Sequence, residues 1–194
     1  MTDAVPVLET ARLILRPLGL PDVEAVQAAF PRWDIVRYLE AAVPWPYPDD
    51  GALTFISTFV LPDMQRGEAW HWSLRPKHEP ERLIGVISLR DKQDDNRGFW
   101  LDPAWQGQGL MAEASEAATD YWFHTLDRPV LRVLKAAANL RSRRISERFG
   151  MRLIEVDDRD FVAGRLPAEL WEITREEWFA RRSLGNGAPA DQAP

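Results

Sequence analysis

Alternating apolar and polar residues predict β-strands at the start of the chain and through its middle. Four runs have the length and pattern of strands: Leu8–Leu18, Ala69–Arg75, Leu83–Arg90 and Gly98–Leu101. A polar, proline-containing stretch at 76–82 joins the second run to the third. We therefore expect the last three runs to form an antiparallel meander. Gly85 inside it predicts a bulge or a close backbone approach.

Apolar residues spaced three and four positions apart predict helices between and after these strands. The expected helices run from Asp22 to about Phe30, over Asp49–Gln65, from Leu110 past Tyr121, from Asn139 to Gly150, and over Arg175–Arg182. Asp22 and Asn139 are residue types that cap helix N-termini, and Gly150 suits a helix C-terminus. The apolar face of the second helix is expected to consist of Leu53, Ile56, Phe59 and Val60.

The second half of the chain contains further strand-like runs. Val130–Ala137 follows a strand–helix unit, so we expect it to run parallel to Gly98–Leu101. A closing hairpin is expected from Met151–Val156, through a turn at 157–159, to Leu170–Thr174. Residues 1–182 are expected to form a single domain, and residues 183–194, which are small and polar without periodicity, a disordered tail.

A glycine-rich turn, WQGQGLMAEA at 105–114, stands between the strand at Gly98–Leu101 and the following helix. The first amides of a helix lack intrahelical partners and carry the positive end of its dipole. Gly107 and Gly109 would let an anion such as phosphate approach those amides. The turn matches neither the Walker A loop nor the dinucleotide fingerprint. An ordinary strand-to-helix turn explains the glycines alone equally well.

Composition limits the kinds of partner and site. The 194-residue chain is 45% hydrophobic and 28% charged, with a net charge of −6, so we expect neither nucleic acid nor a membrane as a partner. There are no cysteines, which excludes disulfides and zinc–thiolate sites. His71, His78 and His124 are scattered, so no metal site is expected. The absence of a long apolar run or a signal pattern favours a cytoplasmic protein.

The turn resembles the acyl-CoA signature of the GNAT acetyltransferases, (Arg/Gln)-x-x-Gly-x-(Gly/Ala). Here it reads Gln106-x-x-Gly109-x-Met111, with Met111 in place of the usual small residue. The resemblance implies that backbone amides of this segment bind the phosphates of acetyl-CoA. The residues concerned are Gln106, Gly107, Gln108, Gly109, Leu110 and Met111.

Two further segments support the resemblance, which covers about residues 7–180. Asn139-x-x-Ser142 with its helix and Gly150-Met151 is similar to the second GNAT motif. The opening LETARLILRPL resembles the ribosomal-protein N-terminal acetyltransferases, the RimJ/RimL-like branch. The family fold implied is a mixed α/β sheet of about seven strands, with a splayed parallel pair and helices on both faces.

The resemblance also implies roles for individual residues. The cofactor's pantetheine arm would pair with backbone at Phe99, Trp100 and Leu101, and the Trp100 backbone would supply a donor to the developing oxyanion. Asn139 and Ser142 would bind the cofactor, with Ser142 as the proton donor to the leaving thiolate. Arg144 belongs to a basic cluster with Arg141, Arg143 and Arg148 that suits phosphate. A solvated helix face also explains that cluster.

The acceptor site and its base are less defined by the sequence. The resemblance places Trp33, Tyr38, Trp45 and Tyr47 in the wall of the acceptor pocket, although aromatics of a loop also pack on a core. His71 should face away from its neighbours Trp70 and Trp72, and it is a weak candidate for the general base, as is Glu172. Asp94 and Asp95 precede the strand where relatives carry a glutamate, so no acid falls clearly in place.

The function implied is transfer of an acetyl group from acetyl-CoA to a primary amine, by direct attack in a ternary complex. The amine would be a protein N-terminus or a small molecule, no metal would take part, and the protein would be a monomer or a homodimer. The alternative is a domain of the same fold that binds or senses acyl-CoA without turnover.

Overall fold

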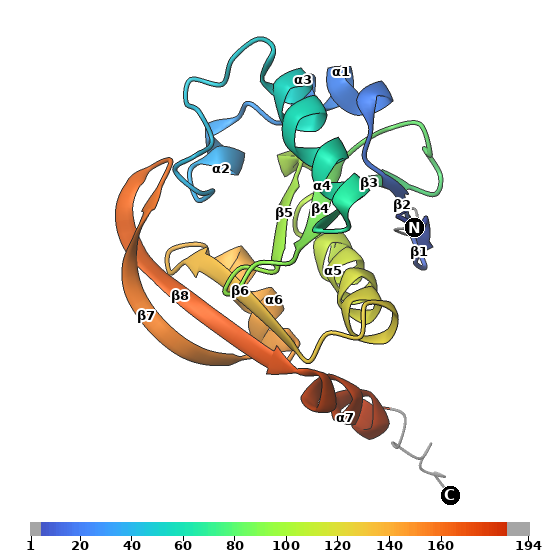
Figure 1. Ribbon diagram of the computed structural model, residues 1–194, viewed down its shortest axis with the longest axis vertical. Helices are drawn as coiled ribbons and strands as arrows, with labels where there is room; N and C mark the ends of the chain where they lie inside the picture. The colour runs from blue at the N-terminus through green and yellow to red at the C-terminus, as the bar shows by residue number, and fades with distance from the viewer. Residues whose placement is uncertain (1–4, 186–194) are drawn as a thin grey trace, which may run out of the picture.

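The computed structural model describes residues 5–185 of the chain, which form two antiparallel sheets with helices on both sides (Figure 1). The strands are β1 (Leu8–Glu9), β2 (Leu13–Pro17), β3 (Ala69–Pro76), β4 (Gly85–Arg90), β5 (Arg97–Leu101), β6 (Val130–Ala136), β7 (Arg152–Phe161) and β8 (Gly164–Thr174). The α-helices are α1 (Val23–Ala29), α2 (Trp33–Val36), α3 (Gly51–Phe55), α4 (Leu61–Arg66), α5 (Leu110–Asp120), α6 (Leu140–Arg148) and α7 (Arg175–Gly185). Short 3-10 turns are η1 (Leu20–Asp22) and η3 (Pro103–Trp105), and π-helical turns are η2 (Ile56–Val60) and η4 (Tyr121–Thr125).

The two sheets meet at one end only. The first has the order β1-β2-β3-β4-β5 and the second β6-β8-β7. At the start of β5, the Asn96 amide donates to the Arg132 carbonyl on β6 at 2.8 Å, and the Arg132 amide donates to Asn96 Oδ1 at 2.7 Å. Beyond this point β5 and β6 belong to different sheets. The predicted splayed pair is therefore present, with its closed end at Asn96.

Each sheet face is covered by its own set of helices. The larger core packs α5 against the strand faces that carry Trp72, Ile87 and Leu101, and it continues to Trp171 on β8 and Trp178 of α7. On the opposite face, α1 to α4 pack around Val86 in a second core. Because side chains alternate along a strand, neighbouring residues of β5 point to different helical layers.

Several predicted boundaries change in the structure. The first expected strand is divided into β1 and β2 by a turn at 10–12. The side chain of Asp22 makes no cap to α1, because it instead accepts a hydrogen bond from the Gly19 amide and pairs with Arg75. β7 and β8 extend through the expected turn at 157–159 to Phe161 and Gly164.

Two further corrections concern helices. Leu53 and Phe59 are exposed, so the buried face of the second predicted helix is formed by Ile56 and Val60. α7 runs to Gly185, into the segment predicted to be a disordered tail, and the remainder of that segment, 186–194, lies outside the described residues. Among residues 5–185, no helix combines the length and the apolar character needed to cross a membrane.

Candidate active site

The glycine-rich turn opens α5 with backbone that only glycine adopts easily. Gly107 and Gly109 both have φ of +78°, and Gly109 is the N-cap of α5. A Cβ added to Gly107 would meet no atom within 4 Å, so the surface above this residue is open. The turn therefore presents the first amides of a helix at an accessible position, which suits an anionic ligand.

Side chains hold this turn against β5 and against the start of α6. Gln106 Nε2 donates to the Leu101 carbonyl at 2.8 Å. Arg141, in the first turn of α6, donates from Nη1 to Gln106 Oε1. The structure thus brings together the N-termini of α5 and α6, which carry the two motifs recognised in the sequence.

Arg12, in the turn between β1 and β2, also contacts the glycine-rich turn. Its Nη1 donates to the Gln108 carbonyl at 2.9 Å, and its Nε donates to Glu113 of α5 at 2.7 Å. Burial would raise the pKa of Glu113, but hydrogen bonds from Thr10 and Arg12 outweigh burial and lower it. Sequence reasoning missed this role for Arg12, although the residue lies within the opening LETARL segment.

The register of β5 decides which backbone groups face the gap between β5 and β6. The Asp102 amide donates to the Ile84 carbonyl at 2.8 Å, which makes these two residues a hydrogen-bonded pair. Hydrogen-bonded pairs alternate along an antiparallel ladder, so Trp100 directs its backbone to Val86 on β4. Phe99 and Leu101 direct their backbone N–H and C=O groups toward the gap. Against the expectation for Trp100, its backbone is therefore directed away from the gap, while cofactor binding at Phe99 and Leu101 stays a prediction.

The first turn of α6 has the expected cap. Asn139 Oδ1 accepts from the Ser142 amide at 3.3 Å, and Ser142 and Ser146 are buried on the sheet side of the helix. Within the basic cluster, Arg143 is engaged by Glu147 and Glu169, so it faces the sheet and not a phosphate. Arg144 is exposed and available to solvent.

His71 is unsuited to act as the general base. It faces α3, as the alternation with Trp70 and Trp72 predicted, and its Nδ1 lies 2.7 Å from Ser88 Oγ. Burial, assisted by the nearby charge of Arg90, lowers the pKa of His71 to about 3. A nitrogen of such low basicity is a poor proton acceptor near neutral pH. The other weak candidate, Glu172, is bound by two arginines, Arg132 and Arg152.

A carboxylate pair at the closed end of the gap was not identified from the sequence. Asp95, just before β5, is hydrogen-bonded to Glu40, and Arg90 forms ion pairs with both. Burial raises the pKa of Asp95 to about 6, with Arg90 opposing the shift and Glu40 adding to it. A Cβ on Gly98 would lie 3.1 Å from Arg90 Nη2, so this cluster covers the α3 side of β5.

The four predicted pocket aromatics occupy three different places. Trp33 and Trp45 form an exposed pair with ring centroids 5.7 Å apart. Tyr47 packs on Phe30 in the second core, where burial raises its pKa to about 12. Tyr38 packs against the β7–β8 hairpin, whose tip pairs with the segment after α2 through the Val162 amide and the Leu39 carbonyl, at 3.0 Å. Trp33 and Trp45 are exposed, whereas Tyr38 and Tyr47 are half-buried, and the place of all four in an acceptor pocket stays a prediction.

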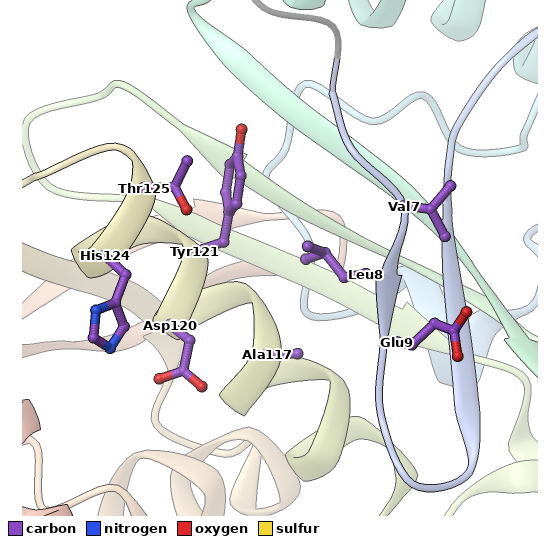
Figure 2. Close-up of a pocket in the computed structure, with 8 residues that line it drawn as sticks. All are labelled: Val7, Leu8, Glu9, Ala117, Asp120, Tyr121, His124 and Thr125. Atoms are coloured by element: carbon purple, nitrogen blue, oxygen red, sulfur yellow. The ribbon is translucent and has the colours of Figure 1, made fainter.

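Two other features of the described region are unrelated to this site. A surface groove between β1 and the end of α5 lies at the opposite end of that helix from the glycine-rich turn (Figure 2). Its lining includes Glu9, Asp120 and His124. Within residues 5–185, no group of three or more histidine or acidic side chains is placed to bind a metal ion.

Comparison with known proteins gives both sequence and structural matches. A family model described as "Acetyltransferase (GNAT) domain" matches residues 12–152. The "Uncharacterized N-acetyltransferase YoaA" of Bacillus subtilis (strain 168) is 30% identical over 126 residues, which cover 62% of this chain and 68% of that protein.

Solved structures share the fold at lower identity. The ribosomal-protein-S5-alanine acetyltransferase from Vibrio fischeri superposes with a TM-score of 0.74 at 15% identity, covering 89% of this chain and 98% of that one. RimL, the ribosomal L7/L12 alpha-N-protein acetyltransferase, in complex with coenzyme A, has a TM-score of 0.72 at 19% identity, with 89% and 98% covered.

Proposed function

The chain belongs to the GNAT acetyltransferase family, and we propose that it moves an acetyl group from acetyl-CoA directly onto a primary amine. The observation that carries this proposal is the left-handed backbone at Gly107 and Gly109, with open space above Gly107, at the mouth of the gap between β5 and β6. Backbone amides at a helix N-terminus bind phosphate, and the splayed strands leave backbone groups for an extended ligand arm.

The residues present fit acetyl-CoA. The amides from Gly107 to Met111 bind the pyrophosphate, while the Gln106 amide donates to the Pro103 carbonyl at 3.3 Å. Phe99 and Leu101 pair with the pantetheine arm. Asn139 and Ser142 contact the same arm from α6, with the Ser142 hydroxyl directed to the sulfur. Arg141 and Arg144 stand at the open end for the remaining phosphate, because guanidinium groups bind phosphate bidentately.

The amine enters from the α3 side of β5, where Asp95, Glu40 and Arg90 are clustered. Asp95 accepts the proton that the attacking nitrogen loses, because its raised pKa keeps it a stronger base than an ordinary aspartate. A developing negative charge on the thioester oxygen is stabilised by a backbone amide of Phe99 or Leu101. The catalytic elements therefore lie on both sides of one strand.

For the acceptor, we propose the amine of a protein N-terminus before a small-molecule amine. Two structural neighbours are named for acetylation of ribosomal proteins, which supports a protein substrate. The exposed Trp33–Trp45 pair beside α2 would contact the residues that follow the terminal amine.

The cofactor site is tested by Gly107→Glu. The substitution places a side chain and a negative charge in the open space above the turn, so acetyl-CoA affinity measured by calorimetry should fall at least about a hundredfold, equivalent to roughly 2.7 kcal/mol. Gly150→Glu is a matched control, because Gly150 also has a positive φ, +69°, and open space around it, at the other end of α6. Equal affinity in both variants and wild type would remove the turn from the binding site.

A thiol-release assay distinguishes an acetyltransferase from a domain that only senses acyl-CoA. The assay uses acetyl-CoA and a panel of ribosomal-protein N-terminal peptides, polyamines and amino sugars. Release with any one amine supports transfer. Tight binding of acetyl-CoA with no release in the whole panel would favour the acyl-CoA-sensing alternative.

A further inference from the structure

Arg97, the first residue of β5, is a buried cation with few partners. Its side chain is 2% exposed and points to the α5 side of the sheet, where Nη1 donates to Thr119 Oγ1 at 2.8 Å. The guanidinium also lies 5.3 Å from the centre of the Phe149 ring. Within the described residues, Nε of Arg97 has no hydrogen-bond partner and no carboxylate forms an ion pair with the group.

Lys135 on β6 is a second buried cation on the same side. It is 4% exposed, its Nζ donates to the hydroxyl of Ser146 on α6, and it lies 5.4 Å from the centre of the Trp171 ring. Glu169 is its cross-strand neighbour on β8. The two oxygens of Glu169 are however occupied, by Arg143 at 3.1 Å and by the Trp171 indole nitrogen at 2.9 Å.

The charges in this layer are unbalanced. Burial, and then the positive charge of Arg97, lower the pKa of Lys135 to about 7, against the attraction of Glu169, Asp95 and Glu147. Burying a cation without a paired anion is costly, and folded proteins rarely retain such groups without a reason. Arg97 lies under α5 and Lys135 under α6, on adjacent splayed strands, so an anion bound between the strands would offset their charges.

We infer that Arg97 and Lys135 form a cationic pocket that receives the sulfur of CoA as a thiolate when the acetyl group leaves. The inference rests on the proposed function, which places the thioester in the gap between β5 and β6. Ser142 and Ser146 lie on one buried face of α6, one helical turn apart. A ligand sulfur beside Ser142 is therefore near the end of the gap where Lys135 is bound to Ser146.

The step balances without a further reactant. The amine nitrogen forms a bond to the carbonyl carbon, the carbon–sulfur bond breaks, and its electron pair goes to sulfur. The proton lost by nitrogen passes to Asp95. The thiolate is held by the two cations and takes up a proton when CoA is released to solvent.

The test is the ionisation of the CoA thiol in the complex, followed by the ultraviolet absorbance of the thiolate as the pH is raised. An unperturbed cysteine thiol has a pKa of about 8.5, and free CoA titrated in parallel supplies the reference for its own thiol. In the wild-type complex we expect the thiolate-to-thiol ratio at a given pH to be at least about tenfold higher than for free CoA, because one pH unit corresponds to a tenfold ratio. In Lys135→Met that increase should largely disappear.

Three comparisons make the result decisive. Lys77→Met removes an exposed lysine just after β3 and should leave the titration of bound CoA unchanged. Affinity for acetyl-CoA, which has no ionisable thiol, should change less than about threefold in Lys135→Met. Arg97→Met should also move the titration of bound CoA back toward that of free CoA, as Lys135→Met does. If Lys135→Met does not fold, Arg97→Met serves as the test variant.

The inference is overturned if CoA bound to the wild-type protein titrates like free CoA, or if its titration is the same in the wild type and in both variants. Failure of the wild type to bind CoA at all would instead contradict the proposed function. The two failures are therefore distinguishable in one experiment.

Discussion

At the scale of single residues, the environment of a side chain decided its chemistry more than its type did. His71 is the residue type most often used as a base, yet burial beside Arg90 makes it a weak one. Asp95 is an ordinary aspartate in sequence, and its burial next to Glu40 raises its pKa to about 6. Such pairs of perturbed carboxylates mark functional sites more often than chance.

Asp95→Asn tests the assignment of the base. Asp95 must be ionised to accept a proton, so kcat of the wild type should fall as the pH drops below about 6, where the carboxyl becomes protonated. The asparagine variant should lose roughly 10²- to 10⁴-fold in kcat, the usual contribution of a general base, and should lack this inflection. Steady-state rates across pH, with saturating amine, measure both effects.

Asp94→Asn is the control for that experiment, because Asp94 is the adjacent carboxylate and its ion pair with Arg132 is half exposed. Its rate and pH profile should match those of the wild type. If Asp95→Asn retained the wild-type rate and inflection, the proton acceptor would have to be another group.

At the scale of elements, the sequence predicted which helices and strands exist better than it predicted the hydrogen-bond register between strands. The glycine spacing at 105–114 and the caps at Asn139 and Gly150 are local signals, and the structure contains the corresponding turn and helix. The direction of the Trp100 backbone depends on which residues of β4 and β5 form hydrogen-bonded pairs, and no local pattern records that. The contact of Arg12 with the glycine-rich turn joins residues almost a hundred positions apart, so no local pattern in the sequence predicts it either.

Gly85→Ala should weaken the pairing of β4 and β5. An added Cβ would lie 2.4 Å from the Trp100 carbonyl oxygen, which is main chain and cannot move without shifting the strand. We expect a loss of about 1–3 kcal/mol in the free energy of unfolding, the usual cost of forcing an extra carbon into a packed site. Urea denaturation measures it.

Gly19→Ala provides the matched comparison for Gly85. Gly19 has an extended φ of −153°, and its added Cβ would be 3.5 Å from Pro21, an ordinary contact. Its stability should stay within about 0.5 kcal/mol of the wild type. A neutral Gly85→Ala would mean that β4 and β5 are not as close as the structure places them.

At the scale of the whole molecule, the site exists because two sheets meet at one end and separate at the other. The glycine-rich turn lies at the open end, the Asp95 cluster lies at the closed end, and the two buried cations lie on the helix-covered side between them. The sequence predicted the splayed pair through its resemblance to the family. The sequence did not predict which residue joins β5 to β6, because Asn96 is an ordinary polar residue in a polar loop.

Asn96→Ala tests whether this closed end sets the geometry of the site. The buried Asn96 side chain accepts from the Arg132 amide at 2.7 Å and donates to the carbonyls of Arg90 and Lys92, so it links β6 to the β4–β5 turn. Leaving a buried backbone group without a partner costs about 1–3 kcal/mol, and three groups lose one here, so we expect a loss of about 3 kcal/mol or more in stability. Because β5 and β6 would lose one of the two hydrogen bonds described at their junction and keep the one from the Asn96 amide to the Arg132 carbonyl, acetyl-CoA affinity should also fall. Asp94→Ala, which removes a surface ion pair from the same loop, should cost no more than about 1 kcal/mol and leave affinity unchanged. If Asn96→Ala lowered stability but bound acetyl-CoA like the wild type, the junction would be a structural link between the sheets with no influence on the gap.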